Sequence, residues 1–335
     1  MKKWIKRKII QYRLNGTKKD WQNKDQKRIL IQLNDHFTRS VWERFWCRYP
    51  FVVEQYEIQY SRNKYELIKL FTQADIAFLY GVSQYLDFSA KPQKKLYLPM
   101  SGLDAMNGKR IPQQTQIDTS KGISSGLIAE YVLSMSILIM NNYHIALKNM
   151  VRRAWTQNSL MNGEHDAIIN KTIGVWGFGN NGKAVADRFV RLGCEVWVTD
   201  IQEPEKNYYG ERFVPFERSN EILDQADIIV LTVPLSKGTR NMVDKNFLGK
   251  IKPDAILINV SRGEVICEPD MLIHLKNHPS FKAVLDVTSK EPLPRNSKLW
   301  KNKNVIITPH ISGNINRLVE HIQEDFLLKV IGKDV

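Results

Sequence analysis

A glycine-rich turn and a downstream aspartate form the motif in this chain that most directly indicates a chemistry. The turn reads Gly177-Phe-Gly179-Asn180-Asn181-Gly182, and Asp200 lies eighteen residues beyond it. In this spacing the first glycine permits a sharp turn, the second lets the backbone approach a pyrophosphate, and the third lets the following helix pack closely on the preceding strand. The N-terminus of that helix offers unpaired N–H groups to phosphates. The motif therefore predicts a dinucleotide site.

Asp200 indicates which dinucleotide is bound. It ends the apolar segment 195–200 and would accept hydrogen bonds from the adenosine ribose 2′- and 3′-hydroxyls. No Lys or Arg follows it immediately, and a 2′-phosphate would meet its negative charge. NAD is therefore favoured over NADP.

Arg262, Glu291 and His310 each follow the end of a predicted strand. In a doubly wound sheet, ligands bind outside the carboxyl ends of the strands, so we expect all three in one crevice. Arg262 could clamp a carboxylate with two parallel hydrogen bonds. His310 could protonate a carbonyl oxygen as hydride arrives, or remove a hydroxyl proton in reverse, and Glu291 beside it would favour the imidazolium. This set suits hydride chemistry on a carbonyl.

Alternating strands and helices must position these groups. In the first half of the chain we predict a helix over 65–71, a longer helix from about 125 through 140, and strands at 29–33, 75–80, 95–98 and 115–117. In the second half we predict strands at 173–177, 195–200, 228–232, 255–260, 283–287 and 305–308. This alternation implies parallel strands with helices on both faces. We therefore expect an α/β protein of two doubly wound parallel-sheet domains with an interdomain cleft.

The net charge of +14 is unevenly distributed. Residues 1–28 carry eleven Lys and Arg against two Asp, and the rest of the chain is only modestly basic. No nucleic-acid-binding motif accompanies the charge, so no nucleic acid is expected as a partner. The basic leader, residues 1–28, is interpreted as a solvated tail or a helix packed on the body; contact of its lysines with an anionic membrane surface is the alternative.

Cysteine usage and hydropathy limit the compartment. The three cysteines are scattered and form no C-x-x-C pair, which fits a reducing cytoplasm and argues against disulfides and against a zinc site. The longest apolar run, residues 131–140, is too short to span a bilayer, and the basic N-terminus lacks the apolar stretch of a secretory signal. We expect a cytoplasmic protein without a metal.

Taken together, these segments resemble the D-isomer-specific 2-hydroxyacid dehydrogenase family. The similarity is specific from about residue 95 to 315, weak from 29 to 95 and absent from the leader. The matching segments are 101–104 (Ser-Gly-Leu-Asp), Ala129-Glu130, Trp155, the glycine turn, 226–234, 259–266, 285–294 and 308–313.

The resemblance implies a flavodoxin-like substrate domain over 29–144 plus 315–335, and a Rossmann NAD-binding domain over 145–314. It implies a catalytic triad of Arg262, Glu291 and His310, with Ser101 and Gly102 holding the substrate carboxylate. The expected cofactor contacts are Gly177, Gly179, Asn180, Asn181, Gly182, Asp200, Thr232, Val233, Pro234, Val260, Ser261, Arg262, Asp286 (on the nicotinamide carboxamide) and His310. It also implies a homodimer formed through the NAD-binding domain and a small 2-hydroxy or 2-oxo acid as substrate.

Two departures from the family pattern affect affinity rather than reaction type. Asn180-Asn181 stands where Arg-Ile is usual, and Thr288-Ser289 replaces an aromatic and acidic pair. Two alternatives to an NAD-dependent D-2-hydroxyacid dehydrogenase remain open. One is an NAD(H)-sensing, corepressor-like interaction protein on the same fold. The other is a dehydrogenase of a non-hydroxyacid such as formate or phosphite.

Overall fold

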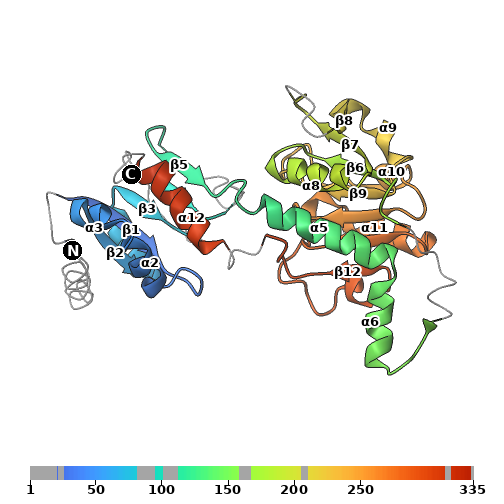
Figure 1. The fold of residues 1–335 in the computed structure, drawn as a ribbon, viewed down its shortest axis with the longest axis horizontal. Coiled ribbons are helices and arrows are strands. Elements are labelled where there is room, and N and C mark those ends of the chain that lie inside the picture. The colour runs from blue at the N-terminus through green and yellow to red at the C-terminus, as the bar shows by residue number, and fades with distance from the viewer. Residues whose placement is uncertain are drawn as a thin grey trace. The chain divides into compact units, whose positions relative to one another are not determined.

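The chain forms two compact α/β units, each built on its own parallel sheet (Figure 1). This computed structural model describes residues 21, 26–80, 95–100, 112–157, 167–204, 210–313 and 318–332. The first unit combines Met1–Ile123 with Ile315–Val335, and the second is Ser124–Asn314. The predicted fold class is confirmed.

The first unit contains a five-stranded sheet in the order β2-β1-β3-β4-β5, and every neighbouring pair is parallel. This is the flavodoxin-like order expected for the unit. Its strands are β1 (Lys27–Gln32), β2 (Tyr56–Ser61), β3 (Ile76–Phe78), β4 (Lys95–Leu98) and β5 (Gln116–Thr119). The leader was predicted as residues 1–28, whereas β1 already begins at Lys27; residues 1–20 and 22–25 lie outside the described part of the chain.

Helices α2 (Arg39–Trp46), α3 (Pro50–Gln55) and α4 (Lys64–Phe71) come from the first part of the sequence, and α12 (Val319–Phe326) from the last. Thr38 caps α2 and Asn63 caps α4, because each side chain accepts a hydrogen bond from a backbone N–H in the first turn. Helix α12 packs its Ile322 and Phe326 into an aromatic core around Trp42 and Phe78. Helix α12, from the C-terminal segment, therefore completes the core of the first unit.

The second unit contains a seven-stranded parallel sheet in the order β12-β11-β10-β9-β6-β7-β8. The strand order reverses between β6 and β9, which is the switch point of a Rossmann sheet. The strands are β6 (Thr172–Trp176), β7 (Glu195–Asp200), β8 (Arg212–Pro215), β9 (Ile228–Leu231), β10 (Ile256–Asn259), β11 (Lys282–Leu285) and β12 (Val305–Ile307). Each loop that follows the carboxyl end of a strand thus leaves the same edge of the sheet.

Both faces of this sheet are covered. Along β9, Ile228 and Val230 enter one core while Ile229 and Leu231 enter the other, because side chains alternate along a strand. The helices of the unit are α5 (Ser125–Met140), α6 (Tyr143–Val151), α8 (Asn180–Arg191), α9 (Asn220–Leu223), α10 (Lys245–Leu248) and α11 (Glu268–Asn277). Continuous apolar strands such as β9 and β10 are the expected result of this double burial.

The boundary between the units differs from the predicted one. The sequence assigned residues 124–144 to the substrate domain, whereas in the structure they belong to the second unit. Helix α5 buries Ile128, Ala129 and Val132 in the same core as Val185 and Phe189 of α8. Its apolar face thus packs against the glycine-turn helix.

The predicted elements lie within about two residues of their predicted limits, but two strands, β2 and β8, and several helices, α2, α3, α9, α10 and α11 among them, were not predicted. In β2, the sequence Tyr-Glu-Ile-Gln-Tyr-Ser alternates polar and apolar side chains, although Glu57 is itself buried. A polar residue inside a buried strand weakens the hydrophobic signal on which such predictions depend.

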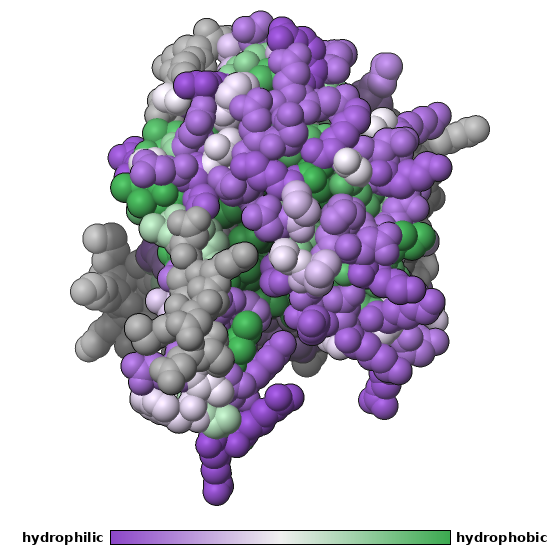
Figure 2. All heavy atoms as spheres, turned by 90° about the vertical axis from the view of Figure 1, so that its right-hand side faces the viewer, coloured by the Kyte–Doolittle hydropathy of each residue, from purple (hydrophilic) through white to green (hydrophobic). Residues whose placement is uncertain are grey.

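The hydropathy of the helices and of the surface was compared with what a membrane protein would show. Among the described residues, no helix is both long and apolar enough to cross a membrane. The face shown in Figure 2 is dominated by hydrophilic side chains, with several small hydrophobic patches rather than one continuous area.

A buried histidine in α11 predicts a loss of stability in acid. His274 stacks on His278, contacts the edge of Phe281, and has a ring Nε2 without a hydrogen-bond partner. Burial, and to a lesser extent the charge of His278, lowers the pKa of His274 from 6.5 to about 4. Between these values the unfolded chain binds a proton that the folded chain refuses, so stability is full above pH 6.5 and falls as the pH drops toward 4.

We expect His274→Leu to remove about 2 kcal/mol of this acid destabilisation at pH 4.5. The measurement is the drop in thermal unfolding temperature between pH 7 and pH 4.5 in wild type and variant. His321→Gln, at an exposed position on α12, is the control and should behave as wild type. Equal drops in wild type and His274→Leu would show that His274 is not responsible.

Candidate active site

The glycine turn lies between the end of β6 and the start of α8, at the switch point of the second sheet. Gly177 has a φ of 94°, a left-handed conformation that side chains other than glycine rarely adopt. A Cβ on Gly182 would lie 1.9 Å from the carbonyl oxygen of Gly177, so only glycine allows the helix to start so close to the strand. The predicted roles of these two glycines have direct geometric reasons.

Gly179 is the N-cap of α8, and no side chain caps this helix. A Cβ on Gly179 would meet no protein atom within 4 Å, so the space in front of it is open. An uncapped helix N-terminus that faces open space leaves N–H groups available for an anion. The turn therefore fits a dinucleotide pyrophosphate.

Asp200 and Thr232 fix the two sides of this turn. The Asp200 carboxylate accepts a hydrogen bond from the Phe178 N–H at 2.6 Å. The Thr232 hydroxyl donates to the carbonyl oxygens of Trp176 at 3.0 Å and Gly177 at 2.7 Å. Both residues thus lie beside the turn, and their contacts with a cofactor remain predictions. Val233 next to Thr232 is buried, whereas Pro234 is exposed.

Asn181, which departs from the family pattern, has a specific partner. Its side-chain oxygen accepts a 2.7 Å hydrogen bond from the hydroxyl of Ser125, the first residue of α5. This bond replaces the apolar packing expected of the usual isoleucine. The neighbouring Asn180 is exposed at the first position of α8.

The turn that carries Arg262 follows β10. Buried Asn259 holds it in shape, because its side chain accepts from the N–H and hydroxyl of Ser261 and donates to the carbonyl of Arg262 at 2.9 Å. Val260 and Ser261 are buried in this turn. The Arg262 guanidinium is half-buried and donates to the carbonyl of Ser261 at 2.7 Å.

Gly263 brings this turn into contact with the loop after β11. A Cβ on Gly263 would lie 1.9 Å from the carbonyl carbon of Thr288 and 2.1 Å from the nitrogen of Ser289. The loop that leads from Thr288 to Glu291 therefore packs directly against the residue after Arg262. This close approach links two of the three predicted catalytic residues.

Glu291 and His310 form a pair at the same edge of the sheet. His310 Nδ1 lies 2.8 Å from Glu291 Oε2, and the second carboxylate oxygen accepts from the N–H of Thr288 at 3.1 Å. The imidazole is 51% exposed. With Nδ1 committed to Glu291, Nε2 is the nitrogen available for proton exchange with a ligand. The two side chains are thus in contact, and their roles in proton transfer remain predictions.

His310 itself is held in a strained conformation by Asp286. Its φ is 54°, and its N–H donates to the carbonyl of Asp286 at 2.8 Å. The buried Asp286 carboxylate accepts hydrogen bonds from the Thr308 hydroxyl at 2.6 Å and from the N–H groups of Ile311 and Ser312 at 2.9 Å each. Asp286 therefore acts as the anchor of the histidine loop, a role that was not predicted; its contact with a nicotinamide carboxamide remains a prediction.

Tyr131 of α5 extends this network. Its hydroxyl lies 2.6 Å from the Thr308 hydroxyl. Burial, more than the nearby Asp286 charge, raises the pKa of Tyr131 well above its usual range, so the phenol stays protonated. The chain from Tyr131 through Thr308 to Asp286 thus fixes the loop that carries His310.

Of the residues predicted to act on a substrate, Arg262, Glu291 and His310 lie in the loops after β10, β11 and β12, at one edge of the second sheet, and Glu291 and His310 are in contact. Ser101 and Gly102 lie outside the described residues. The sequence analysis missed the positioning residues Asn259, Gly263, Thr308 and Tyr131. Asn259 gave a signal, since it is a polar residue at the end of an apolar strand; Tyr131 gave none, because its partner is far away in the sequence.

Three comparisons with known proteins bear on this site. Residues 133–312 match the family described as "D-isomer specific 2-hydroxyacid dehydrogenase, NAD binding domain". The chain is 31% identical over 208 residues to (S)-sulfolactate dehydrogenase of Chromohalobacter salexigens, covering 61% of this chain and 66% of the relative. It is 30% identical over 189 residues to human glyoxylate reductase/hydroxypyruvate reductase, covering 56% and 58%. It therefore spans less than two thirds of the length of these two curated relatives.

A solved structure covers more of the chain. The D-isomer specific 2-hydroxyacid dehydrogenase family protein from Aeromonas salmonicida subsp. salmonicida shares 26% sequence identity and a TM-score of 0.78, covering 91% of this chain and 96% of that one. The family match includes the glycine turn, Arg262, Glu291 and His310. The chain thus belongs to the D-isomer specific 2-hydroxyacid dehydrogenase family, whose members are nicotinamide-dependent oxidoreductases.

Proposed function

We propose that the protein is an NAD-dependent dehydrogenase that interconverts a D-2-hydroxy acid and its 2-oxo acid. The observation that supports this best is the 2.8 Å pair of His310 and Glu291, which lies at the same edge of the sheet as the glycine turn and Arg262. This reaction requires three components: an acid–base residue, a cationic side chain that binds the substrate carboxylate, and a turn that binds the dinucleotide.

The second unit would hold NAD with the glycine turn against the pyrophosphate and with Asp200 on the adenosine ribose. NAD supplies the hydride acceptor in one direction and, when reduced, the hydride donor in the other. Asp200 lies at the end of β7, and the next charged residue, Glu203, is also acidic and exposed. Two negative charges beside the ribose disfavour a 2′-phosphate, which supports NAD over NADP.

The catalytic roles follow from the geometry. Arg262 would bind the substrate carboxylate through parallel N–H donors, giving up its bond to the carbonyl of Ser261. His310 would transfer a proton between Nε2 and the oxygen on C2, as general acid in reduction and as general base in oxidation. Glu291 orients the imidazole and stabilises its positive charge through Nδ1. Ser101 and Gly102 remain proposed contacts of the same carboxylate.

The test is NADH oxidation by the purified full-length chain against a panel of 2-oxo acids. Glyoxylate and hydroxypyruvate are tested first, because relatives are named as reductases of these two acids. Sulfolactate oxidation with NAD is tested next, because another relative is named (S)-sulfolactate dehydrogenase. We expect saturable turnover of at least one. If no 2-oxo acid is turned over although NADH still binds, the result would favour an NAD(H)-sensing protein. If NAD is reduced only with formate or phosphite, the result would favour a dehydrogenase of a non-hydroxyacid.

Asp200→Asn tests the cofactor preference. Asparagine keeps an oxygen for the Phe178 N–H but removes the charge. We expect the ratio of kcat/KM for NADH to that for NADPH to fall about tenfold, since a hydrogen bond to a charged group is worth about 1.5 kcal/mol or more. Glu203→Gln is the matched charge control. An unchanged ratio in Asp200→Asn would contradict the assigned contact.

We further propose that the protein is a homodimer formed through the second unit. Helix α6 has no buried residue, and Leu147, Met150, Val151 and the following Trp155 are more than half exposed. Such an apolar helix favours cover by a partner surface. Sedimentation velocity should give twice the 39.0 kDa mass of the chain, and a monomer at micromolar concentration would exclude the dimer.

We also propose that the protein is located in the cytoplasm. The three free cysteines support this, because a reducing compartment keeps thiols free.

A further inference from the structure

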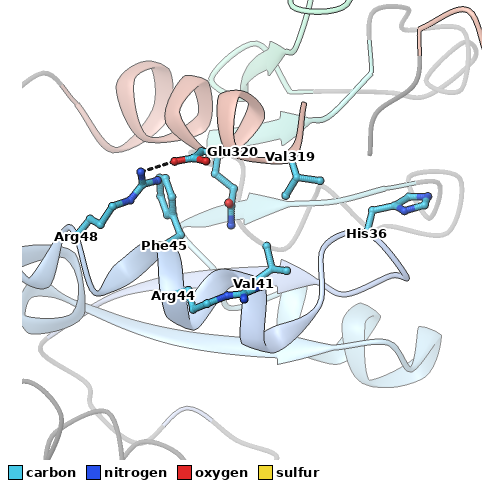
Figure 3. A pocket seen from close by; sticks show the side chains of 8 residues that line it. His36, Val41, Arg44, Phe45, Arg48, Val319 and Glu320 are labelled. Carbon is cyan, nitrogen blue, oxygen red and sulfur yellow. Dashed lines mark hydrogen bonds and ion pairs between the residues drawn. The ribbon is translucent and has the colours of Figure 1, made fainter. Parts of the chain in front are cut away.

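A cavity of about 600 Å³ lies in the first unit between α2 and α12 (Figure 3). This volume is within the range of small-molecule sites. Val41 and Phe45 of α2 and Val319 of α12 supply apolar walls, and His36 lies at one end. No residue assigned to the dehydrogenase reaction lines this cavity, so what it holds is a separate question.

Gln323 of α12 gives the first indication of a ligand. It lines the cavity, is only 2% exposed, and its Nε2 has no hydrogen-bond partner. Buried polar groups are almost always paired, and an unpaired one requires an explanation. An amide nitrogen can only donate, so the missing group is a hydrogen-bond acceptor.

The two arginines of the cavity differ in their partners. Arg48 forms an ion pair with Glu320 across the cavity, and Glu324 lies 3.8 Å from the same guanidinium (Figure 3). Arg44 lies on α2, four residues before Arg48, and its side chain forms no ion pair or hydrogen bond with the described part of the chain. The Arg48 guanidinium is therefore occupied by two carboxylates, whereas the Arg44 guanidinium offers its N–H donors to the same cavity as the unpaired amide donor of Gln323.

We propose that this cavity binds a small monocarboxylate with a short apolar tail. One carboxylate oxygen would accept from the Gln323 amide and the other from the Arg44 guanidinium, while the tail would contact Phe45, Val41 and Val319. Glu320 on the same wall disfavours a dianion such as phosphate, and Arg44 disfavours a cation. The ligand would connect α2 to α12, two helices from opposite ends of the sequence, and so stabilise the first unit.

The experiment is calorimetric titration of 3-methylbutanoate, an aliphatic monocarboxylate, into the full-length protein. Because Arg262 is also expected to bind carboxylates, every variant is made in an Arg262→Gln background. We expect saturable binding in this background, accompanied by a rise in unfolding temperature. Affinity should fall about tenfold or more in Arg44→Gln and in Gln323→Leu, each of which loses one charge-assisted hydrogen bond.

Two controls define the outcome. Arg62→Gln removes an arginine of the same unit that bonds Asp35 and Asn34 outside the cavity, and should leave binding unchanged. Uncharged 3-methylbutanamide should bind at least tenfold more weakly, and inorganic phosphate should not compete. The proposal would be overturned if affinity were unchanged in Arg44→Gln and Gln323→Leu. It would also be overturned if the carboxylate did not bind at concentrations on the order of 10 mM. Arg44 is exposed, so its variant decides the matter even if Gln323→Leu fails to fold.

Discussion

Replacing His310 with asparagine is expected to lower kcat for the 2-oxo acid by about 10²–10⁴-fold while leaving NADH affinity within about twofold. The imidazole is the group placed to exchange a proton with the substrate, and its Nδ1 is held by Glu291. Asparagine is chosen because His310 has a φ of 54°, and asparagine tolerates this left-handed conformation better than alanine does. Steady-state kinetics and NADH fluorescence titration measure the two quantities.

Glu291→Gln separates proton transfer from orientation. Glutamine has a single side-chain oxygen, so it can keep the contact with His310 Nδ1 but loses the bond from the Thr288 N–H, and it removes the negative charge. We expect a smaller loss, about tenfold to a hundredfold in kcat, because the imidazole keeps a partner but its positive charge is no longer stabilised by a carboxylate. If His310→Asn and Glu291→Gln both turned over at wild-type rates, the acid–base assignment would be wrong.

Gly182→Ala is expected to abolish NADH binding and to lower the unfolding temperature. The new methyl group would lie 1.9 Å from the Gly177 carbonyl oxygen, so the start of α8 must move away from the strand end. Overpacking of this kind costs about 1–3 kcal/mol, and the turn that should hold the pyrophosphate is displaced as well. Differential scanning fluorimetry and NADH titration report the two effects.

Gly179→Ala is the matched control, because its methyl group would meet no protein atom within 4 Å. The variant should have the unfolding temperature of the wild type. Its NADH affinity should fall, because the methyl group would occupy the space in which we propose that the pyrophosphate binds. Wild-type NADH affinity in Gly179→Ala would show that this face of the turn does not approach a cofactor. Wild-type stability in Gly182→Ala would contradict the packing role of that glycine.

The parts of this fold that were predictable from sequence are those with strong local signals. The run Ile228–Leu231 is apolar throughout because both faces of the sheet bury it, and the glycine turn is constrained by contacts within a few residues. The pairing of His310 with Glu291 followed from a general property of parallel sheets, that loops after the carboxyl ends of strands share an edge.

The parts that could not be predicted depend on contacts between distant residues. Nothing in the neighbourhood of Asn181 reveals that Ser125 supplies its hydrogen-bond partner, or that α5 packs on α8 and so moves the domain boundary. Likewise, the family resemblance implied that Asp286 is a cofactor ligand, and its sequence neighbourhood gave no sign of a further role. Its three hydrogen bonds to 308–312 become visible only when β11 and β12 lie side by side.

The most direct test of the proposed reaction is a comparison of wild type with Arg262→Gln for NADH binding and for turnover of the best 2-oxo acid. Glutamine keeps a donor near the Ser261 carbonyl but cannot form the paired, charged contact with a carboxylate. We expect kcat/KM to fall about 10²-fold or more while the dissociation constant for NADH is unchanged. Turnover at the wild-type rate in Arg262→Gln would contradict this expectation.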